Sequence, residues 1–160
     1  MNAEEFKKLI AEAEQDPKRL AAAVSGVPET VLKHKPAPGK WSIHEIVGHL
    51  ADSEIVFAYR FRQVLADKDP TFAPIDQDAW AQHLGYTEAA IPELIAQFGV
   101  NRFHNLRLLR RAGLEAFSKS GFHPERSRQV TLEEMFQYWV AHGPNHLAQI
   151  ERLKKAAEKK

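Results

Sequence analysis

The chain has 160 residues, 22 basic and 21 acidic side chains and no cysteine. This length predicts one domain, residues 1–160, which can fold without disulfides or a metal. The net charge of +1 gives no overall attraction to nucleic acid or anionic lipid. The lack of cysteine excludes thiolate zinc sites and a cysteine nucleophile. A charged N-terminus and the lack of a long apolar run argue against a secretory signal and a membrane span, so we expect a soluble cytoplasmic domain.

The N-terminal region is expected to be helical over residues 3–25. An interruption is predicted at Asp16-Pro17, where Asp16 would cap a new helix and Pro17 would take its first position. Residues 34–40 contain two prolines and a glycine and are expected to form an extended connection.

A strong helix is predicted from Ser42 to about Asp67. Ser42 and Glu45 have the spacing of a capping box, in which each side chain bonds to the backbone of the other residue. Apolar residues follow at helical spacing and form one inward stripe. Its members are Ile46, Val47, Leu50, Phe57, Phe61, Val64 and Leu65.

The middle of the chain contains a long connection over residues 67–86, with a short helix expected at Asp76–His83. Thr87 is expected to cap the next long helix, which runs to about Ser118. Pro92 is compatible with that helix because it lies near its start.

The C-terminal third is expected to begin with a loop over Gly121–Arg128. Thr131 and Glu134 form a second capping box, which opens a final helix that runs toward Lys155. No segment alternates as a strand would, so we predict an all-α fold. Four long helical segments are typical of a four-helix bundle, here with a long second connection.

Two histidines in the final helix, His142 and His146, are one turn apart on the same face. Their Cβ atoms are about 5–6 Å apart at this spacing, which lets two imidazoles share one metal ion. A helical metalloprotease motif has a glutamate between its histidines, but here Gly-Pro-Asn occupies that place. The pair therefore does not indicate a metalloprotease.

The stripe that carries these two histidines faces the core, and so does His49 in the earlier helix. A single inward histidine is more often hydrogen-bonded to a carbonyl or carboxylate than bound to a metal. A shared cation would satisfy all three imidazoles, but only if the two helices are neighbours. Pro144 lies between the paired histidines, where it removes a helical hydrogen bond. We expect a kinked but continuous helix, because the apolar stripe keeps its phase; the alternative is a helix that ends at Gly143 and restarts.

Four segments resemble the DinB-like family of bacterial damage-inducible proteins. They are KWSIHEIVGHLADSEIVFAYRFRQVLA over residues 40–66, Asp76–Ala81, Phe122–Glu125 and HGPNHLAQ over His142–Gln149. Together they cover most of the chain after residue 30, in the order and spacing of that family. The match is specific to the family and weak for any single activity.

The resemblance implies a metal triad of His49, His142 and His146, an up-down-down-up bundle and a homodimer. Related activities are metal-dependent transfers of low-molecular-weight thiols, such as bacillithiol or mycothiol, onto electrophiles, and some relatives are proposed hydrolases. Three histidines leave a fourth ligand position open, as in catalytic sites. We expect a divalent metal, zinc or nickel, and a small-molecule substrate that is a thiol, an electrophile or both.

Several further residues are candidates for supporting roles. Asp52 and Glu45 lie near His49 in the helix and could orient its free nitrogen, although Glu45 is better explained as a cap. Tyr59 and Arg60 are candidates to line a cleft or to serve a dimer. His123 is expected in a loop without a catalytic role. The three tryptophans are expected in the core or in a pocket wall, and they are Trp41, Trp80 and Trp139.

Two competing interpretations stay open from the sequence. The first is DNA binding through the basic stretch 94–114, which contains Arg102, Arg107, Arg110 and Arg111 and no acidic residue. A solvated helix face explains it better, and no helix-turn-helix or zinc-finger pattern is present. The second is a non-catalytic bundle whose histidines bind metal incidentally or only pack.

Overall fold

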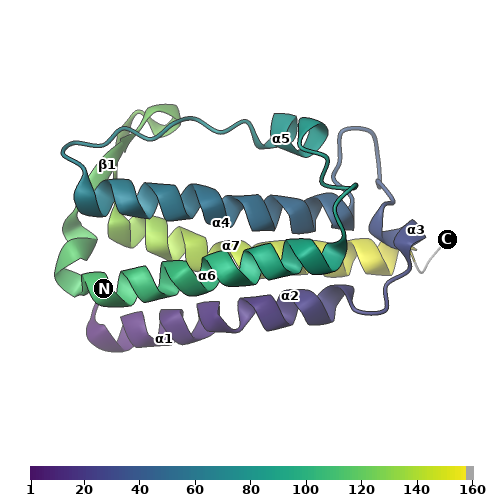
Figure 1. The fold of residues 1–160 in the computed structure, drawn as a ribbon, viewed down its shortest axis with the longest axis horizontal. Helices are drawn as coiled ribbons and strands as arrows, with labels where there is room; N and C mark the ends of the chain where they lie inside the picture. Colours follow the sequence, from purple (N-terminus) through teal and green to yellow (C-terminus); the bar gives the residue numbers. More distant parts are fainter. Residues whose placement is uncertain (158–160) are drawn as a thin grey trace.

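The computed structural model describes residues 1–157, so the last three residues of the predicted domain lie outside it. Most of the described chain is helical (Figure 1). In chain order the elements are α1 (Ala3–Glu14), α2 (Asp16–Val24), α3 (Glu29–Leu32), α4 (Ile43–Ala66), α5 (Gln77–His83), α6 (Ile91–Ala112), the 3-10 helix η1 (Leu114–Ser118), β1 (Ser120–His123), the 3-10 turn η2 (Pro124–Arg126), β2 (Arg128–Thr131) and α7 (Leu132–Ala157).

Four rods form the bundle: α1 together with α2, then α4, α6 and α7. Figure 1 shows α1, α2 and α7 running in one direction and α4 and α6 in the other. Side-chain bonds agree, because Asp52 pairs with Gln97 and Glu54, further along α4, pairs with Asn105, further along α6. The predicted four-helix bundle is confirmed, and in this structure the four rods run up, down, down and up along the chain. The long crossover over residues 67–90 is needed because α4 and α6 are parallel.

Both predicted capping boxes are present, and they set where the two longest helices begin. The Ser42 amide donates to Glu45 Oε2 at 2.8 Å, and the Glu45 amide donates to Ser42 Oγ at 3.2 Å. At the start of α7 the Thr131 amide donates to Glu134 Oε2 at 2.9 Å and the Glu134 amide to Thr131 Oγ1 at 3.1 Å. These bonds satisfy backbone donors that have no partner within the helix.

Two other predicted caps are wrong. Asp16 is the first residue of α2 rather than its cap, because its carboxylate pairs with the buried Arg102 of α6 at 2.9 Å. Thr87 lies before the start of α6. The N-cap of α6 is Ala90, and no side chain makes a capping hydrogen bond there. The Asp16 side chain therefore binds a residue of a distant helix and not the backbone at the start of α2.

The region after α6 also differs from the prediction. The helix ends at Ala112 and not near Ser118, because Gly113 adopts a φ of 72°, which only glycine takes without strain. The expected loop over Gly121–Arg128 instead lies within the antiparallel hairpin β1–β2, whose register pairs Phe122 with Gln129. The start of the crossover joins this hairpin, since the Phe72 amide donates to the Phe122 carbonyl at 2.9 Å. Strands of four residues are too short for an alternating pattern to reveal them.

Helix α7 continues without interruption through Pro144. This result excludes the alternative in which the helix ends at Gly143 and restarts. His142 and His146 therefore stay one turn apart on one face.

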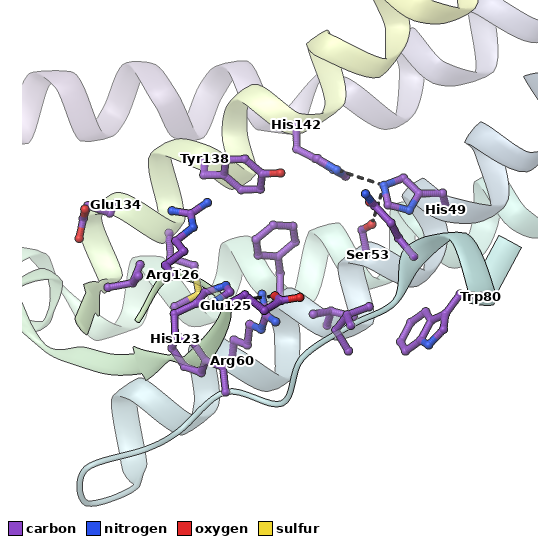
Figure 2. Close-up of a pocket in the computed structure, with 17 residues that line it drawn as sticks. His49, Ser53, Arg60, Trp80, His123, Glu125, Arg126, Glu134, Tyr138 and His142 are labelled. Carbon is purple, nitrogen blue, oxygen red and sulfur yellow. Dashed lines mark hydrogen bonds and ion pairs between the residues drawn. The ribbon is translucent and has the colours of Figure 1, made fainter. Parts of the chain in front are cut away.

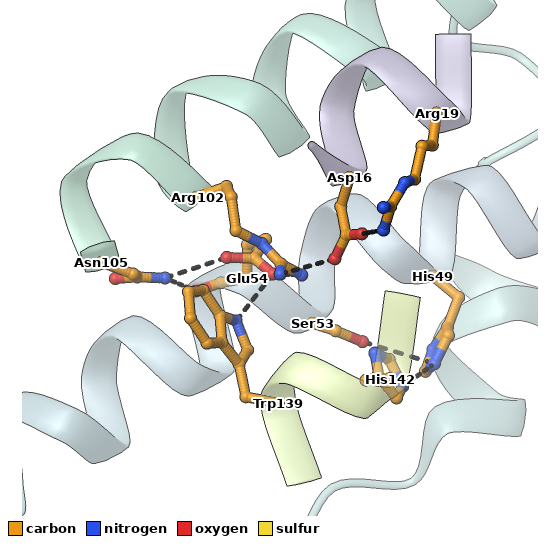
Figure 3. A network of polar contacts seen from close by, with 9 residues as sticks. All are labelled: Asp16, Arg19, His49, Ser53, Glu54, Arg102, Asn105, Trp139 and His142. Atoms are coloured by element: carbon orange, nitrogen blue, oxygen red, sulfur yellow. Dashed lines mark hydrogen bonds and ion pairs between the residues drawn. The ribbon is translucent and has the colours of Figure 1, made fainter. Parts of the chain in front are cut away.

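A polar layer crosses the bundle at mid-height and separates two apolar clusters. Figure 3 shows its centre, Arg102, between Asp16 and Glu54. The guanidinium nitrogens lie 2.9 Å from Asp16 Oδ2 and 2.7 Å from Glu54 Oε1, and all three side chains are almost fully buried. Trp139 Nε1 and Asn105 Nδ2 donate to the Glu54 carboxylate at 2.8 and 3.1 Å.

None of the helices in residues 1–157 is long and apolar enough to cross a membrane.

Candidate metal centre

Three histidines from two helices converge beside this polar layer. His49 comes from α4 and His142 and His146 come from α7, and one potential ligand atom of each lies within 4.8 Å of the others. The Nε2 atoms of His49 and His142 are 3.3 Å apart. Two nitrogens bound to one tetrahedral zinc ion at about 2.0–2.1 Å would themselves be about 3.3 Å apart. The arrangement therefore fits a shared metal ion, and it equally allows a direct hydrogen bond between two neutral imidazoles.

The orientation of His146 is set by Gln149, one turn further along α7. His146 Nδ1 lies 2.9 Å from Gln149 Oε1, so Nδ1 carries the proton and Nε2 is left as the acceptor. A hydrogen bond of this kind orients a metal-ligating imidazole and makes it a better ligand. We did not anticipate this role for Gln149 from the sequence, although a spacing of three residues on one helix allows it.

Burial keeps the triad uncharged. Desolvation, with a smaller contribution from His146, lowers the pKa of His49 to about 3. Desolvation and the neighbouring imidazoles lower the pKa of His142 to about 2. Burial also lowers the pKa of His146. Neutral imidazole is the form that binds a metal, so the three side chains need lose no proton at neutral pH.

These lowered pKa values predict that the metal-free protein loses stability as the pH falls. In the unfolded chain the histidines take up protons below pH about 6.5, whereas the folded protein leaves them neutral. The free energy of unfolding therefore decreases as the pH falls, by about 1 kcal/mol between pH 7 and 5.5 for each imidazole that stays neutral in the folded protein. Urea unfolding in the presence of a chelator at these two pH values measures the change. Equal stability at both would show that the imidazoles are protonated in the folded state.

Polar and aromatic side chains surround the triad. Ser53 Oγ is 3.3 Å from His49 Nε2, the nitrogen that also faces His142. Trp41 covers another side, with its ring centroid 4.7 Å from that of His49 and 6.4 Å from that of His146. The rings of Phe57 and Tyr138 lie on the His142 side, with centroids 5.9 and 5.8 Å from that of His142.

Asp52 does not take the role expected for it. Its carboxylate accepts hydrogen bonds from Tyr86 Oη at 2.9 Å and from Gln97 Nε2 at 3.0 Å, and within residues 1–157 it makes none to His49. Asp52 instead joins α4 to α6 and to the crossover. The Tyr86 ring also packs closely against α4 at Gly48. A Cβ at this position would lie 2.4 Å from the ring, so glycine is needed there.

The triad opens onto a cavity of about 290 Å³, shown in Figure 2. Small-molecule sites begin at about this size. His49, Ser53 and His142 line one end, and α4, α7, the crossover and the hairpin supply the walls. Among the side chains singled out from the sequence, Arg60, Trp80 and His123 line the cavity, whereas Trp139 is in the core and Tyr59 is exposed. His123 therefore belongs to the cavity wall, which its expected place in a loop did not reveal.

The basic stretch on α6 does not form one continuous face. Arg102 is buried in the polar layer, and Arg107, Arg110 and Arg111 are exposed. Arg110 pairs with Glu14 of α1. The prediction of a solvated helix face therefore applies to three of the four arginines.

Comparison with known proteins points to one family. The sequence-family model of the DinB superfamily matches residues 12–150 of the chain. A protein of Bacillus subtilis (strain 168), named "Putative metal-dependent hydrolase YfiT", is 28% identical over 150 residues, which cover 94% of this chain and 84% of that protein. A protein of Bacillus cereus (strain 03BB102), with a name of the same class, is 27% identical over 148 residues, which cover 91% of this chain and 83% of that one.

The fold has a close counterpart among solved structures. The structure of YfiT from Bacillus subtilis, described as a "probable metal-dependent hydrolase with an unusual four-helix bundle topology", superposes with a TM-score of 0.93 at 26% identity. The superposition covers 99% of this chain and 90% of that one.

Proposed function

Because the chain belongs to the DinB superfamily, we propose that it is a metal-dependent hydrolase of a small molecule. In this proposal His49, His142 and His146 hold a divalent ion, zinc or nickel. The observation that carries it is the convergence of three uncharged imidazoles at the end of a cavity. The names of the Bacillus relatives support the reaction class.

The ion would act as a Lewis acid and lower the pKa of a coordinated water or thiol. The residues of this chain supply the rest of the site. Gln149 orients His146, and Trp41 shields the triad on one side. The Ser53 hydroxyl next to His49 is placed to hydrogen-bond a polar group that enters from the cavity.

Transfer of a substrate thiol is the second candidate reaction. The metal-binding cluster found within residues 1–157 contains only histidines, so it includes no carboxylate that could take a proton from water. A thiol has less need of such a base, because its ordinary pKa is about 8.5 and a bound metal holds it as thiolate. The chain has no cysteine, so the thiol would have to be a substrate.

Metal analysis and turnover assays together test this proposal. Protein purified without a histidine tag is expected to contain one divalent ion per chain. Metal-loaded and metal-stripped protein are then compared on a panel of esters and amides and on pairs of thiols and electrophiles. Metal-dependent turnover of the first panel supports hydrolysis, and turnover of the second supports thiol transfer. Bound metal without turnover on either would favour a non-catalytic metal-binding bundle.

The Gln149→Ala variant is expected to bind the metal about 10–100-fold more weakly than the parent protein. The substitution leaves all three ligands in place but removes the acceptor that holds His146 Nδ1–H. Competition with a chromophoric chelator measures the affinity. Gln137→Ala is the matched control, because Gln137 is exposed on the same helix. Equal affinities of the two variants would show that Gln149 does not support the site.

The proposal also includes a homodimer. Large apolar side chains are exposed on α4 and α6, which pack side by side, and they are Ile55, Tyr59, Val100 and Phe103. Burial of these side chains against a second copy would remove them from water.

A further inference from the structure

The end of the cavity away from the triad contains two arginines, Arg60 and Arg126, that form no ion pair with any residue of the described chain, 1–157. Arg60 lies three turns beyond His49 on the same face of α4, which corresponds to about 16 Å of helix. Figure 2 shows Arg60, His123, Glu125 and Arg126 gathered at this end and His49 and His142 at the other. Between the two ends the walls are mainly apolar, formed by Val56, Phe57, Phe72, Ile75, Met135 and Tyr138.

The Arg60 guanidinium is half-buried and only partly satisfied. One nitrogen donates to the Ala73 carbonyl at 3.0 Å, and the group lies 5.4 Å from the centre of the Phe72 ring. A guanidinium has five N–H donors. Burial lowers the pKa of Arg60, which reflects the cost of holding this charge away from water. The structure holds Arg60 in place from the crossover and leaves its remaining donors available to the cavity.

A second cation and one carboxylate set the local charge. Arg126 lies with its guanidinium 5.6 Å from the centre of the Tyr138 ring. Within residues 1–157 neither Arg60 nor Arg126 forms an ion pair, whereas nearby Arg128 pairs with Glu134 at 2.8 Å. Glu125 adds one negative charge. Burial, together with Arg60 and Arg126, lowers the pKa of His123 and keeps it neutral. The group at this end therefore has a net charge of about +1.

We propose that Arg60, assisted by Arg126, binds a carboxylate of the substrate at this end of the cavity while the reacting group lies at the histidine triad. This assignment rests on the proposed function for the triad end only. The implied substrate has one carboxylate, an apolar middle and its reacting group at the opposite end. A single negative charge matches the local charge of the site, whereas a phosphate dianion would exceed it. Charge-assisted hydrogen bonds from a guanidinium are stronger than neutral ones and favour carboxylate geometry.

The test uses metal-free protein, so that a carboxylate cannot bind a metal instead. Hexanoate, 1-hexanol and hexyl phosphate are titrated at pH 7, and binding is followed by amide chemical shifts. We expect hexanoate to bind about tenfold more tightly than hexanol and at least as tightly as hexyl phosphate. Equal binding of hexanoate and hexanol would overturn the proposal. Tighter binding of the phosphate by tenfold or more would overturn the assignment to a carboxylate.

Two variants and a control locate the binding site. The Arg60→Gln variant is expected to lose the tenfold preference for hexanoate. Arg62→Gln is expected to keep it, because Arg62 is exposed on the same helix and is not part of the cavity wall. Loss of the preference in both variants would place the anion elsewhere and reject the proposal.

Arg60→Gln also removes the hydrogen bond to Ala73, so this variant could fail to fold. Arg126→Gln removes no hydrogen bond to the crossover and is expected to reduce the preference about threefold. If Arg60→Gln does not fold, Arg126→Gln decides the question, and an unchanged preference would overturn the proposal.

A final measurement separates this proposal from the one for the metal. Cobalt-loaded protein is titrated with 6-mercaptohexanoate and 6-mercaptohexanol, and the thiolate-to-cobalt absorption band is followed. A band for both thiols, with the carboxylate compound favoured about tenfold, supports both proposals. If the protein takes up no cobalt, the metal proposal fails, but the hexanoate titration still decides whether Arg60 binds a carboxylate.

Discussion

The His142→Ala variant is expected to bind divalent metal at least about 100-fold more weakly than the parent protein. His142 supplies one of three converging nitrogens, and its Nε2 lies 3.3 Å from that of His49. Loss of a direct ligand should cost more than loss of an orienting partner, which typically costs 10–100-fold. Elemental analysis of tag-free protein and competition with a chelator measure the difference.

His104→Ala is the matched control for this experiment. His104 is exposed on α6 and is not a member of the triad, so its removal should leave the metal content unchanged. Stoichiometric, tightly held metal in His142→Ala would show that the ion binds elsewhere. The triad would then be three neutral histidines, with His49 bonded to His142 and Ser53 and His146 bonded to Gln149.

Replacement of Arg102 by methionine is expected to destabilise the protein by about 3–5 kcal/mol. The variant keeps much of the side-chain volume but leaves the carboxylates of Asp16 and Glu54 buried without their shared cation. It also removes a cation that lies 4.1 Å from the centre of the Trp139 ring. Chemical denaturation at pH 7 measures the loss.

Arg110→Met separates the effect of burial from that of losing an arginine on α6. Arg110 forms a half-exposed ion pair with Glu14, and such pairs contribute about 0.2–1 kcal/mol. Similar losses in the two variants would mean that the buried network adds little beyond an ordinary surface pair.

The loss of stability caused by Arg102→Met should become smaller as the pH falls. Burial already raises the pKa of Asp16 and of Glu54, against the opposing effect of Arg102. Without the arginine both carboxyl groups hold their protons more strongly in the folded state than in the unfolded chain. Protonation therefore favours the folded variant at low pH, and this contribution is lost as the pH rises through the folded-state pKa values.

The polar layer also connects the bundle to the candidate metal centre. Glu54 follows Ser53 on α4, and Trp139, which bonds to Glu54, lies one turn before His142 on α7 (Figure 3). Gly143, next to His142, faces α2 so closely that a Cβ there would lie 2.6 Å from Asp16 Oδ2. The buried charges therefore help to set how α4 and α7 face each other at the triad.

Some features of this fold were predictable because they depend on a few neighbouring residues. Ser42 with Glu45 and Thr131 with Glu134 satisfy backbone donors within one turn, so the sequence itself determined where α4 and α7 begin. The spacing of His142 and His146 likewise placed both on one helical face, and an apolar stripe in constant phase indicated that α7 passes through Pro144.

Other features depended on which helices became neighbours. The periodicity of the sequence left open whether His49 meets the other two histidines, and only the family resemblance implied that it does. In the structure, the antiparallel packing of α4 on α7 brings the three side chains together. Asp52 turned to Tyr86 and Gln97, and Asp16 turned to Arg102, because those partners arrive from distant parts of the chain. Hydrogen bonds within one turn are encoded by adjacent residues, whereas contacts between helices follow from the packing of the whole core.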